Sequence, residues 1–146
     1  KQRHIEKTLP LIIGSMDGLH LLTDSIPSDA KKLIEKFWPG PLTIIFKALP
    51  NLPSDITSEG KVAVRMPGDS FALKIARVAG FPITATSANI SDMPPAETAS
   101  AVVEYFKDGI DIVIDDGRTH GGLPSTIVDA CEGLRVIRKG AIEINI

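Results

Sequence analysis

The chain has 146 residues, and its 16 Lys and Arg against 18 Asp and Glu give a formal net charge of −2. This length suits one domain whose core needs no disulfide or metal to stabilise it. The balanced charge and an aromatic content of 5% exclude a strong nonspecific nucleic-acid binder and a base-stacking platform.

The first half of the chain predicts alternating strands and helices. The apolar run 9–13 predicts a buried strand. A helix is expected from Ser28, as its N-cap, to Trp38, because apolar residues recur at helical spacing between them. Three further elements are expected: strands over 42–48 and 62–66, and a helix capped by Asp69 or Ser70 that ends at Ala79 with Gly80 as its C′ residue.

The second half predicts strands over 82–86, 110–114, 126–130 and 134–138, with a helix over 98–107. Strands and helices mixed in this order indicate a layered α/β (α+β) sheet, and the closely spaced C-terminal strands indicate an antiparallel part. No repeat or low-complexity tract is present, so one domain over residues 1–146 is expected.

The single cysteine, Cys131, excludes an internal disulfide and a multi-cysteine zinc site, and its apolar segment predicts a small buried side chain. The start lacks the apolar core of a signal peptide, and no apolar run approaches membrane-spanning length. A cytoplasmic location is therefore expected. Because the first residue is Lys1 and not methionine, we expect a truncated or processed form.

A polar segment follows the expected strand 82–86. Ser87, Asn89 and Ser91 alternate with apolar residues, so in extended backbone their side chains would share one face. Open α/β sheets bind ligands at such polar strand ends. An Asx or Ser turn leading into a helix explains the same pattern, and the local sequence does not decide between the two.

Further segments occur in the order of one family's motifs. They are Lys1-Gln2-Arg3 with Lys7-Thr-Leu-Pro-Leu, Phe37-Trp-Pro-Gly-Pro-Leu-Thr43, Val62-Ala-Val-Arg-Met-Pro67, Thr86-Ser-Ala-Asn-Ile-Ser91, Ser125-Thr-Ile-Val-Asp129 and Val136-Ile-Arg-Lys-Gly-Ala-Ile142. Together they resemble the YrdC family, the L-threonylcarbamoyladenylate synthases that supply the threonylcarbamoyl group for tRNA modification. The resemblance covers nearly the whole chain.

The resemblance implies a twisted open mixed sheet, flanked by helices, with a concave ligand-binding face. It implies a nucleotidyltransferase that joins L-threonine, bicarbonate or CO2 and ATP into threonylcarbamoyl-adenylate and releases pyrophosphate. Mg2+ would accompany the ATP. The implied partners are these substrates and the tRNA-modifying transferases that receive the product; weak double-stranded RNA binding is conceivable, and no membrane is involved.

The resemblance also assigns site residues. The catalytic residues would be Lys1, Arg3, Ser87 and Asn89. ATP would be bound by Arg3, Lys7, Ser87, Asn89 and Arg138, and L-threonine by Arg65 and Ser125. No metal ligand is assigned.

The residues themselves leave plainer interpretations open. The N-terminal Lys and Arg fit a solvated basic terminus. Arg65, between apolar neighbours, fits a structural salt bridge, and Arg138 fits an ordinary basic strand end. Thr43 either borders the pocket or is a plain strand threonine, with the second interpretation favoured. The adjacent Asp115 and Asp116 are expected to be solvated and not to bind a metal.

The chain departs from the family pattern at its start. Family members usually begin well before the K-x-R element, so a domain lacking its N-terminal portion is expected, and the proline often found after the arginine is absent. Two other classes of function stay open: a noncatalytic nucleotide- or RNA-binding module, and a carbamoyl-transfer domain of a larger maturation protein. The absence of zinc-finger cysteines makes the last less favoured.

Overall fold

The computed structural model describes residues 9–90, 93–119 and 121–145. These fall into two compact units, one within residues 1–85 and 123–146 and the other within 86–122, and each is described by itself. The strands are β1 (Leu11–Ile12), β2 (Leu42–Lys47), β3 (Lys61–Arg65), β4 (Ile83–Thr84), β5 (Thr126–Asp129) and β6 (Arg135–Arg138). The helices are α1 (Met16–His20), α2 (Ser28–Phe37), α3 (Phe71–Ala79), α4 (Ala99–Phe106) and the 3-10 turn η2 (Lys107–Gly109).

The six strands of the described chain form one open mixed sheet in the first unit, in the order β4-β1-β3-β2-β5-β6. Strand β1 runs parallel to β3, and β2 runs parallel to β5. The other neighbouring pairs, β1–β4, β2–β3 and β5–β6, are antiparallel. The predicted open mixed sheet with an antiparallel C-terminal part is confirmed.

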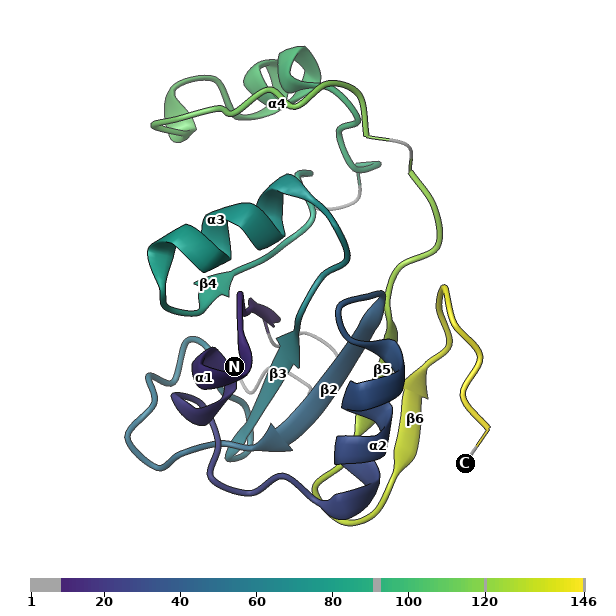
Figure 1. Cartoon of the computed structure of the whole chain (residues 1–146). Helices are drawn as coiled ribbons and strands as arrows, with labels where there is room; N and C mark the ends of the chain where they lie inside the picture. The colour runs from purple at the N-terminus through teal and green to yellow at the C-terminus, as the bar shows by residue number, and fades with distance from the viewer. Residues whose placement is uncertain (1–8, 91–92, 120, 146) are drawn as a thin grey trace. The chain divides into compact units, whose positions relative to one another are not determined.

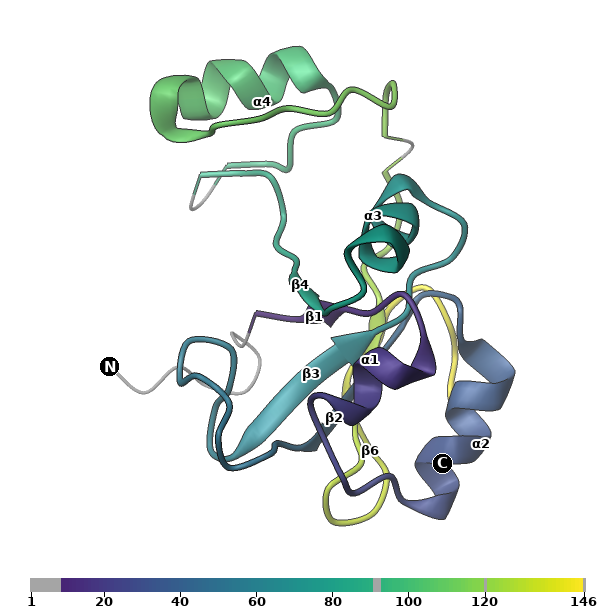
Figure 2. The same cartoon turned by 60° about the vertical axis from the view of Figure 1, so that its left-hand side comes forward.

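The hydrophobic core lies against one face of this sheet. Thr43 and Ile45 of β2, which project from the other face, are only 2% and 3% exposed, and Leu42, Ile44 and Phe46 are fully buried on this face. They cluster with Leu19 of α1 and Leu33 of α2. Both helices lie over this core face (Figures 1 and 2). The intervening strand residues therefore belong to the opposite face, which we call the open face.

The ends of the helices agree in part with the sequence. Ser70 is the N-cap of α3, and its Oγ accepts a hydrogen bond from the Leu73 N–H, as expected. Gly80 ends that helix in the left-handed conformation, with φ of 72°. The prediction that Ser28 is an N-cap is wrong: α2 begins at Ser28 and Pro27 precedes it as the cap residue. Proline fixes φ in a range suited to the helix start.

The structure differs from the prediction in two segments. Residues 110–114 do not form a strand, although their β-branched residues predicted one, and Ile112 is 80% exposed. A strand needs a neighbour for its backbone groups, and the structure assigns this segment none within the described residues. Helix α1 was not predicted, because its five residues, which include Gly18, are too few to show a helical period.

The second unit is built around α4. The Thr98 side chain caps this helix by accepting a hydrogen bond from the Ala101 N–H. Glu97, just before the cap, pairs with Arg118 at 2.6 Å and accepts the Thr119 N–H on its carbonyl oxygen. These contacts join the two ends of the unit. No helix among the described residues of either unit is long and apolar enough to cross a membrane.

Gly14 provides a test of the packing between β1 and α3. A Cβ at this position would lie 2.5–2.7 Å from backbone atoms of Ala76 and Arg77, which cannot move aside without shifting the helix. We expect Gly14→Ala to destabilise the fold by about 1–3 kcal/mol in urea unfolding, the usual range for overpacking. Gly68→Ala, where a Cβ meets nothing within 4 Å, is the matched control. Equal stability of the two variants would contradict this packing.

Candidate functional site

Four polar residues are gathered at one end of the sheet. Arg65 ends β3, Thr43 lies at the start of β2, Ser125 directly precedes β5, and Arg138 ends β6. Because β2 is antiparallel to β3 and parallel to β5, and β6 is antiparallel to β5, these four ends coincide. Continuing the register beyond the Ile44–Val64 pair by one residue sets Thr43 opposite Arg65.

The same residues share the open face. Thr43 alternates with Leu42 and Ile44, whose side chains enter the core. Arg138 joins this face because of an irregularity between β5 and β6: Val128 pairs with Val136, yet Ile127 pairs with Arg138. The extra residue in β6 is a β-bulge, which changes the face onto which a following side chain projects. In a regular ladder Arg138 would pair with Thr126 and project toward the core face.

Hydrogen bonds connect Ser125 with two of these residues. The Thr43 and Ser125 hydroxyl oxygens lie 2.8 Å apart. The Arg138 guanidinium donates to the Ser125 carbonyl oxygen at 2.9 and 3.2 Å and to its Oγ at 3.3 Å. Ser125 and Arg138, one predicted to contact L-threonine and the other ATP, are therefore in direct contact.

Arg65 is half-buried at the end of β3. Its Nε donates to the Gly40 carbonyl oxygen at 3.0 Å, which fixes the plane of the guanidinium. The predicted alternative, a structural salt bridge, is wrong for the described residues, because none of their ion pairs includes Arg65. Burial lowers the pKa of Arg65 from its usual value, but a guanidinium stays charged at neutral pH. No carboxylate of the described residues neutralises its charge.

Ser87 and Asn89 lie in the second unit, where a turn holds them. A bend at Ala88 and Asn89, with the Asn89 N–H bonded to the Ser87 carbonyl oxygen at 3.0 Å, agrees with the turn and not with the extended backbone, the two alternatives that the sequence left open. The Ser87 hydroxyl donates to the Asn89 side-chain oxygen, and the Asn89 amide donates to the carbonyl oxygens of Ile90 and Met93. Their predicted role with nucleotide stays a prediction.

The strands bring only part of the predicted site to one end of the sheet, where ligands of open α/β sheets bind. Strand β4 is antiparallel to β1, so at Ala85 the chain leaves the sheet away from the end that carries Arg65. The register thus brings together Arg65, Ser125 and Arg138 and does not decide the place of Ser87 and Asn89. The other assigned residues, Lys1, Arg3 and Lys7, lie outside the described residues.

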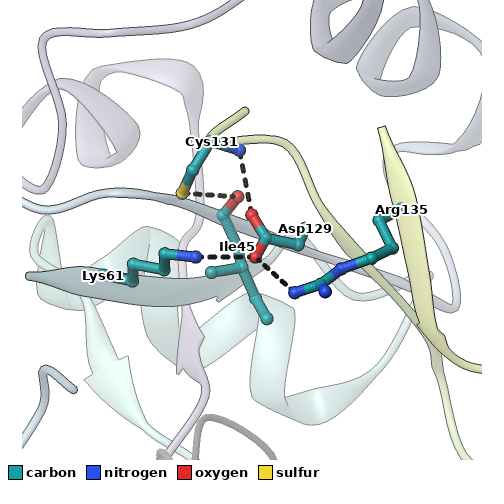
Figure 3. A network of polar contacts seen from close by, with 5 residues as sticks. All are labelled: Ile45, Lys61, Asp129, Cys131 and Arg135. Atoms are coloured by element: carbon teal, nitrogen blue, oxygen red, sulfur yellow. Dashed lines mark hydrogen bonds and ion pairs between the residues drawn. The ribbon is translucent and has the colours of Figure 1, made fainter. Parts of the chain in front are cut away.

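The sequence did not indicate a second polar cluster, at the far end of the same strands. Asp129 of β5 accepts from Lys61 Nζ at 2.8 Å and from the Cys131 N–H at 2.9 Å, and Arg135 lies 3.6 Å away (Figure 3). Burial disfavours the Asp129 carboxylate, but hydrogen bonds from Lys61 and Cys131 outweigh it, so its pKa is lowered. The hydrogen bond with Asp129 raises the pKa of Lys61. This network fixes β3, β5 and β6 to one another.

Cys131 shows no sign of reactivity. It is half-buried, less than expected, and its Sγ lies 3.8 Å from the Ile45 carbonyl oxygen. Burial, with the nearby Asp129 carboxylate, raises the pKa of the thiol to about 12. The thiol therefore stays protonated at neutral pH and is a poor nucleophile.

The described residues contain no recognisable metal centre. Within 9–90, 93–119 and 121–145, no group of three or more His, Cys, Asp or Glu side chains could hold a metal ion. Asp115 and Asp116 are exposed, and an Asp115 carboxylate oxygen accepts the Gly117 N–H.

The fold and the site together define a class of protein. One sheet face is covered by helices, and the other carries two arginines and two hydroxyls at one end. Such a surface suits the binding and orientation of an anionic small molecule.

Comparison with known proteins identifies the family. The family profile Sua5_yciO_yrdC, described as "Telomere recombination", matches residues 1–140. The chain belongs to this family, and the resemblance inferred from its motifs is confirmed.

Relatives with curated names support the same identification. The chain is 40% identical to a Pyrococcus abyssi protein and 37% identical to one from an Enterobacter strain, each named threonylcarbamoyl-AMP synthase. These matches cover 90% and 92% of this chain, and 39% and 72% of the relatives. The chain thus spans well under half the length of the Pyrococcus protein.

A solved structure shows the same fold. The crystal structure of P. abyssi Sua5 complexed with L-threonine has a TM-score of 0.83 and 38% sequence identity to this chain. The similarity covers 94% of this chain and 41% of that one. The expected YrdC-like fold is confirmed, and the activity implied by the resemblance agrees with the names of these relatives.

Proposed function

We propose that the protein is an L-threonylcarbamoyladenylate synthase, which joins L-threonine, bicarbonate or CO2 and ATP and releases pyrophosphate. One observation carries the proposal. The two residues assigned to L-threonine, Arg65 and Ser125, flank Thr43 at one end of the open face, and the assigned nucleotide ligand Arg138 is bonded to Ser125. A related structure is described as complexed with L-threonine, which supports an amino-acid site here.

The roles follow from the chemistry of the side chains. The Arg65 guanidinium offers two parallel N–H groups to the carboxylate of L-threonine, with its plane fixed by Gly40. Ser125 offers a hydroxyl beside it. Arg138 presents its remaining N–H groups to a phosphate or ribose oxygen of ATP. Lys1, Arg3, Lys7, Ser87 and Asn89 complete the proposed nucleotide site on sequence grounds.

The reaction forms two bonds in turn. The amino nitrogen of L-threonine adds to CO2, supplied directly or by bicarbonate with loss of water, and a proton leaves the nitrogen. A carbamate oxygen then attacks the α-phosphorus of ATP, and pyrophosphate leaves with the electron pair of the broken P–O bond. Fixed positive charge stabilises the charge that develops there, so placing the reactants in line is the main task of the protein. Mg2+ bound to ATP would supply further charge neutralisation.

The proposed product has a role in tRNA modification. The product would be passed to transferases that complete threonylcarbamoyladenosine on tRNA, and a cytoplasmic location fits this role. Direct RNA contact would need a local basic patch, because a net charge of −2 gives little long-range attraction.

Selectivity among amino acids tests the proposed substrate. We expect pyrophosphate release to be at least roughly tenfold more efficient with L-threonine than with L-serine, which lacks the methyl group, and more strongly reduced with L-valine, which lacks the hydroxyl. A site that hydrogen-bonds a hydroxyl rejects an analogue that leaves its polar groups unpaired. The measurement is kcat/KM from coupled pyrophosphate detection. Equal rates with the three amino acids would remove L-threonine from the proposal.

A further inference from the structure

Thr43 is a buried residue at the centre of the proposed amino-acid site. Only 2% of it is exposed, and it lies on the open face between two predicted ligands of L-threonine. On one side the β2–β3 register sets it opposite Arg65. On the other side its Oγ1 is 2.8 Å from Ser125 Oγ. The sequence favoured a plain strand threonine here.

The direction of the Thr43–Ser125 hydrogen bond follows from counting donors and acceptors. Each hydroxyl has one hydrogen to donate and two lone pairs. Within the described residues, Ser125 Oγ is the partner of the Thr43 hydroxyl. If Ser125 donated to Thr43, the buried Thr43 hydrogen would have no acceptor there, and an unmade buried donor is costly. On the contacts of the described residues, we therefore assign Thr43 as the donor and Ser125 as the acceptor.

Counting donors and acceptors also gives the direction of the Ser125 O–H bond. Its Oγ accepts from Thr43 and from the Arg138 guanidinium, which lies 3.3 Å away, so both lone pairs are occupied. The Ser125 O–H must then point away from these two groups. Ser125 is only partly buried, so this hydrogen is available to a ligand. An O–H held in this way donates to an oxygen and does not accept from a donor.

We propose that Thr43 is a positioning residue that, with Arg138, sets Ser125 as a hydrogen-bond donor to the carboxylate of the amino-acid substrate. The inference rests on the proposed function and deepens it. The carboxylate is the group concerned because Arg65, the positively charged residue assigned to L-threonine, lies opposite Thr43 in the β2–β3 register. Thr43 does not touch the substrate in this account; it acts through Ser125.

The test compares L-threonine binding to variants of the full-length protein by calorimetry, with ATP binding as an internal reference. Thr43→Val keeps the shape of the side chain and removes the hydroxyl. We expect it to weaken L-threonine binding about five- to tenfold, the effect of one lost net hydrogen bond, and to change ATP binding less than about twofold. Thr43→Ser, which keeps the hydroxyl, should restore binding.

Thr23 supplies a matched control. It is fully buried, and among the described residues its hydroxyl bonds to the backbone of Ser25 alone, near the opposite end of β2. Thr23→Val removes a buried hydroxyl as Thr43→Val does, so it should lower the melting temperature and leave L-threonine binding unchanged. If Thr43→Val does not fold, Thr43→Ala, measured at a lower temperature, removes the same hydroxyl with less crowding.

A double-mutant cycle separates positioning from a general structural effect. If Thr43 acts through Ser125, Thr43→Val has little further effect on L-threonine binding in a Ser125→Ala background. Unchanged binding in folded Thr43→Val, or a full additional loss in the Ser125→Ala background, overturns the inference while leaving the proposed function intact. A wild-type protein that binds no L-threonine overturns both.

Discussion

Replacing Arg65 by alanine is expected to lower kcat/KM for L-threonine by roughly a hundredfold to a thousandfold, the effect of removing one preorganised charged partner. The guanidinium is half-buried and fixed by its bond to Gly40, so little reorganisation is needed when a carboxylate binds. Loss of that bond should cost the fold only about 1 kcal/mol. Activity should therefore fall far more than stability.

Arg65→Lys is the informative control, because it keeps the charge and loses the planar pair of donors. We expect activity between that of wild type and Arg65→Ala, with the loss mainly in KM for L-threonine. The measurements are steady-state pyrophosphate release and thermal unfolding of each variant. An alanine variant that is folded and fully active would show that Arg65 only fixes the turn at Gly40.

The second large effect is expected on stability, from the network around Asp129. The Asp129 side chain is 5% exposed and that of Lys61 23%, so Asp129→Asn leaves a partly buried ammonium without its counter-charge. Breaking a buried pair in this way should cost about 3 kcal/mol in urea unfolding. Replacing Lys61 by methionine as well should recover part of the loss, because the remaining charge is then gone.

Asp29→Asn is the matched control for this variant. Asp29 also pairs with a lysine at 2.8 Å, but both side chains are largely exposed, at 59% and 76%, so solvent screens the pair. We expect little change in the unfolding midpoint. If the two asparagine variants lose the same stability, the Asp129 network contributes no more than an ordinary surface pair.

The same network predicts how stability depends on pH. The pKa of Asp129 lies below its ordinary value of 3.8, so its contribution is present above that pH and is lost as the pH falls through the lower, folded-state pKa. The pKa of Lys61 lies above 10.5, so its contribution is present below that pH and is lost as the pH rises through the folded-state pKa. In Asp129→Asn, the free energy of unfolding should therefore depend less on pH at both the acidic and the alkaline end, as measured by urea unfolding over a range of pH.

Local patterns predicted the elements that have a clear period or cap. The spacing of apolar residues identified α2, the apolar run after its end identified β2, and Ser70 and Gly80 identified the ends of α3. Residues 110–114 show the limit of such patterns. Their β-branched residues favour a strand, but a strand exists only when another chain segment pairs with it, and no local signal reports that.

The candidate site could be predicted only in part for a similar reason. Motifs indicated Arg65, Ser125 and Arg138, but their contacts depend on strand register. The bond between Thr43 and Ser125 joins residues 82 positions apart, and a bulge in β6 sets the face of Arg138. The Lys61–Asp129 pair spans 68 positions, and although Asp129 ends one of the family motifs, no local signal paired it with Lys61. Pairings of this kind follow from the sheet as a whole and not from any segment.

The most direct test of the proposed function is detection of the product. The full-length protein is incubated with ATP, Mg2+, L-threonine and isotopically labelled bicarbonate, and the nucleotides are analysed by mass spectrometry. We predict threonylcarbamoyl-adenylate that carries the label in its carbamoyl carbon, with one pyrophosphate released for each molecule formed. Pyrophosphate release that does not depend on L-threonine, or ATP turnover that gives no labelled adenylate, would contradict the proposal.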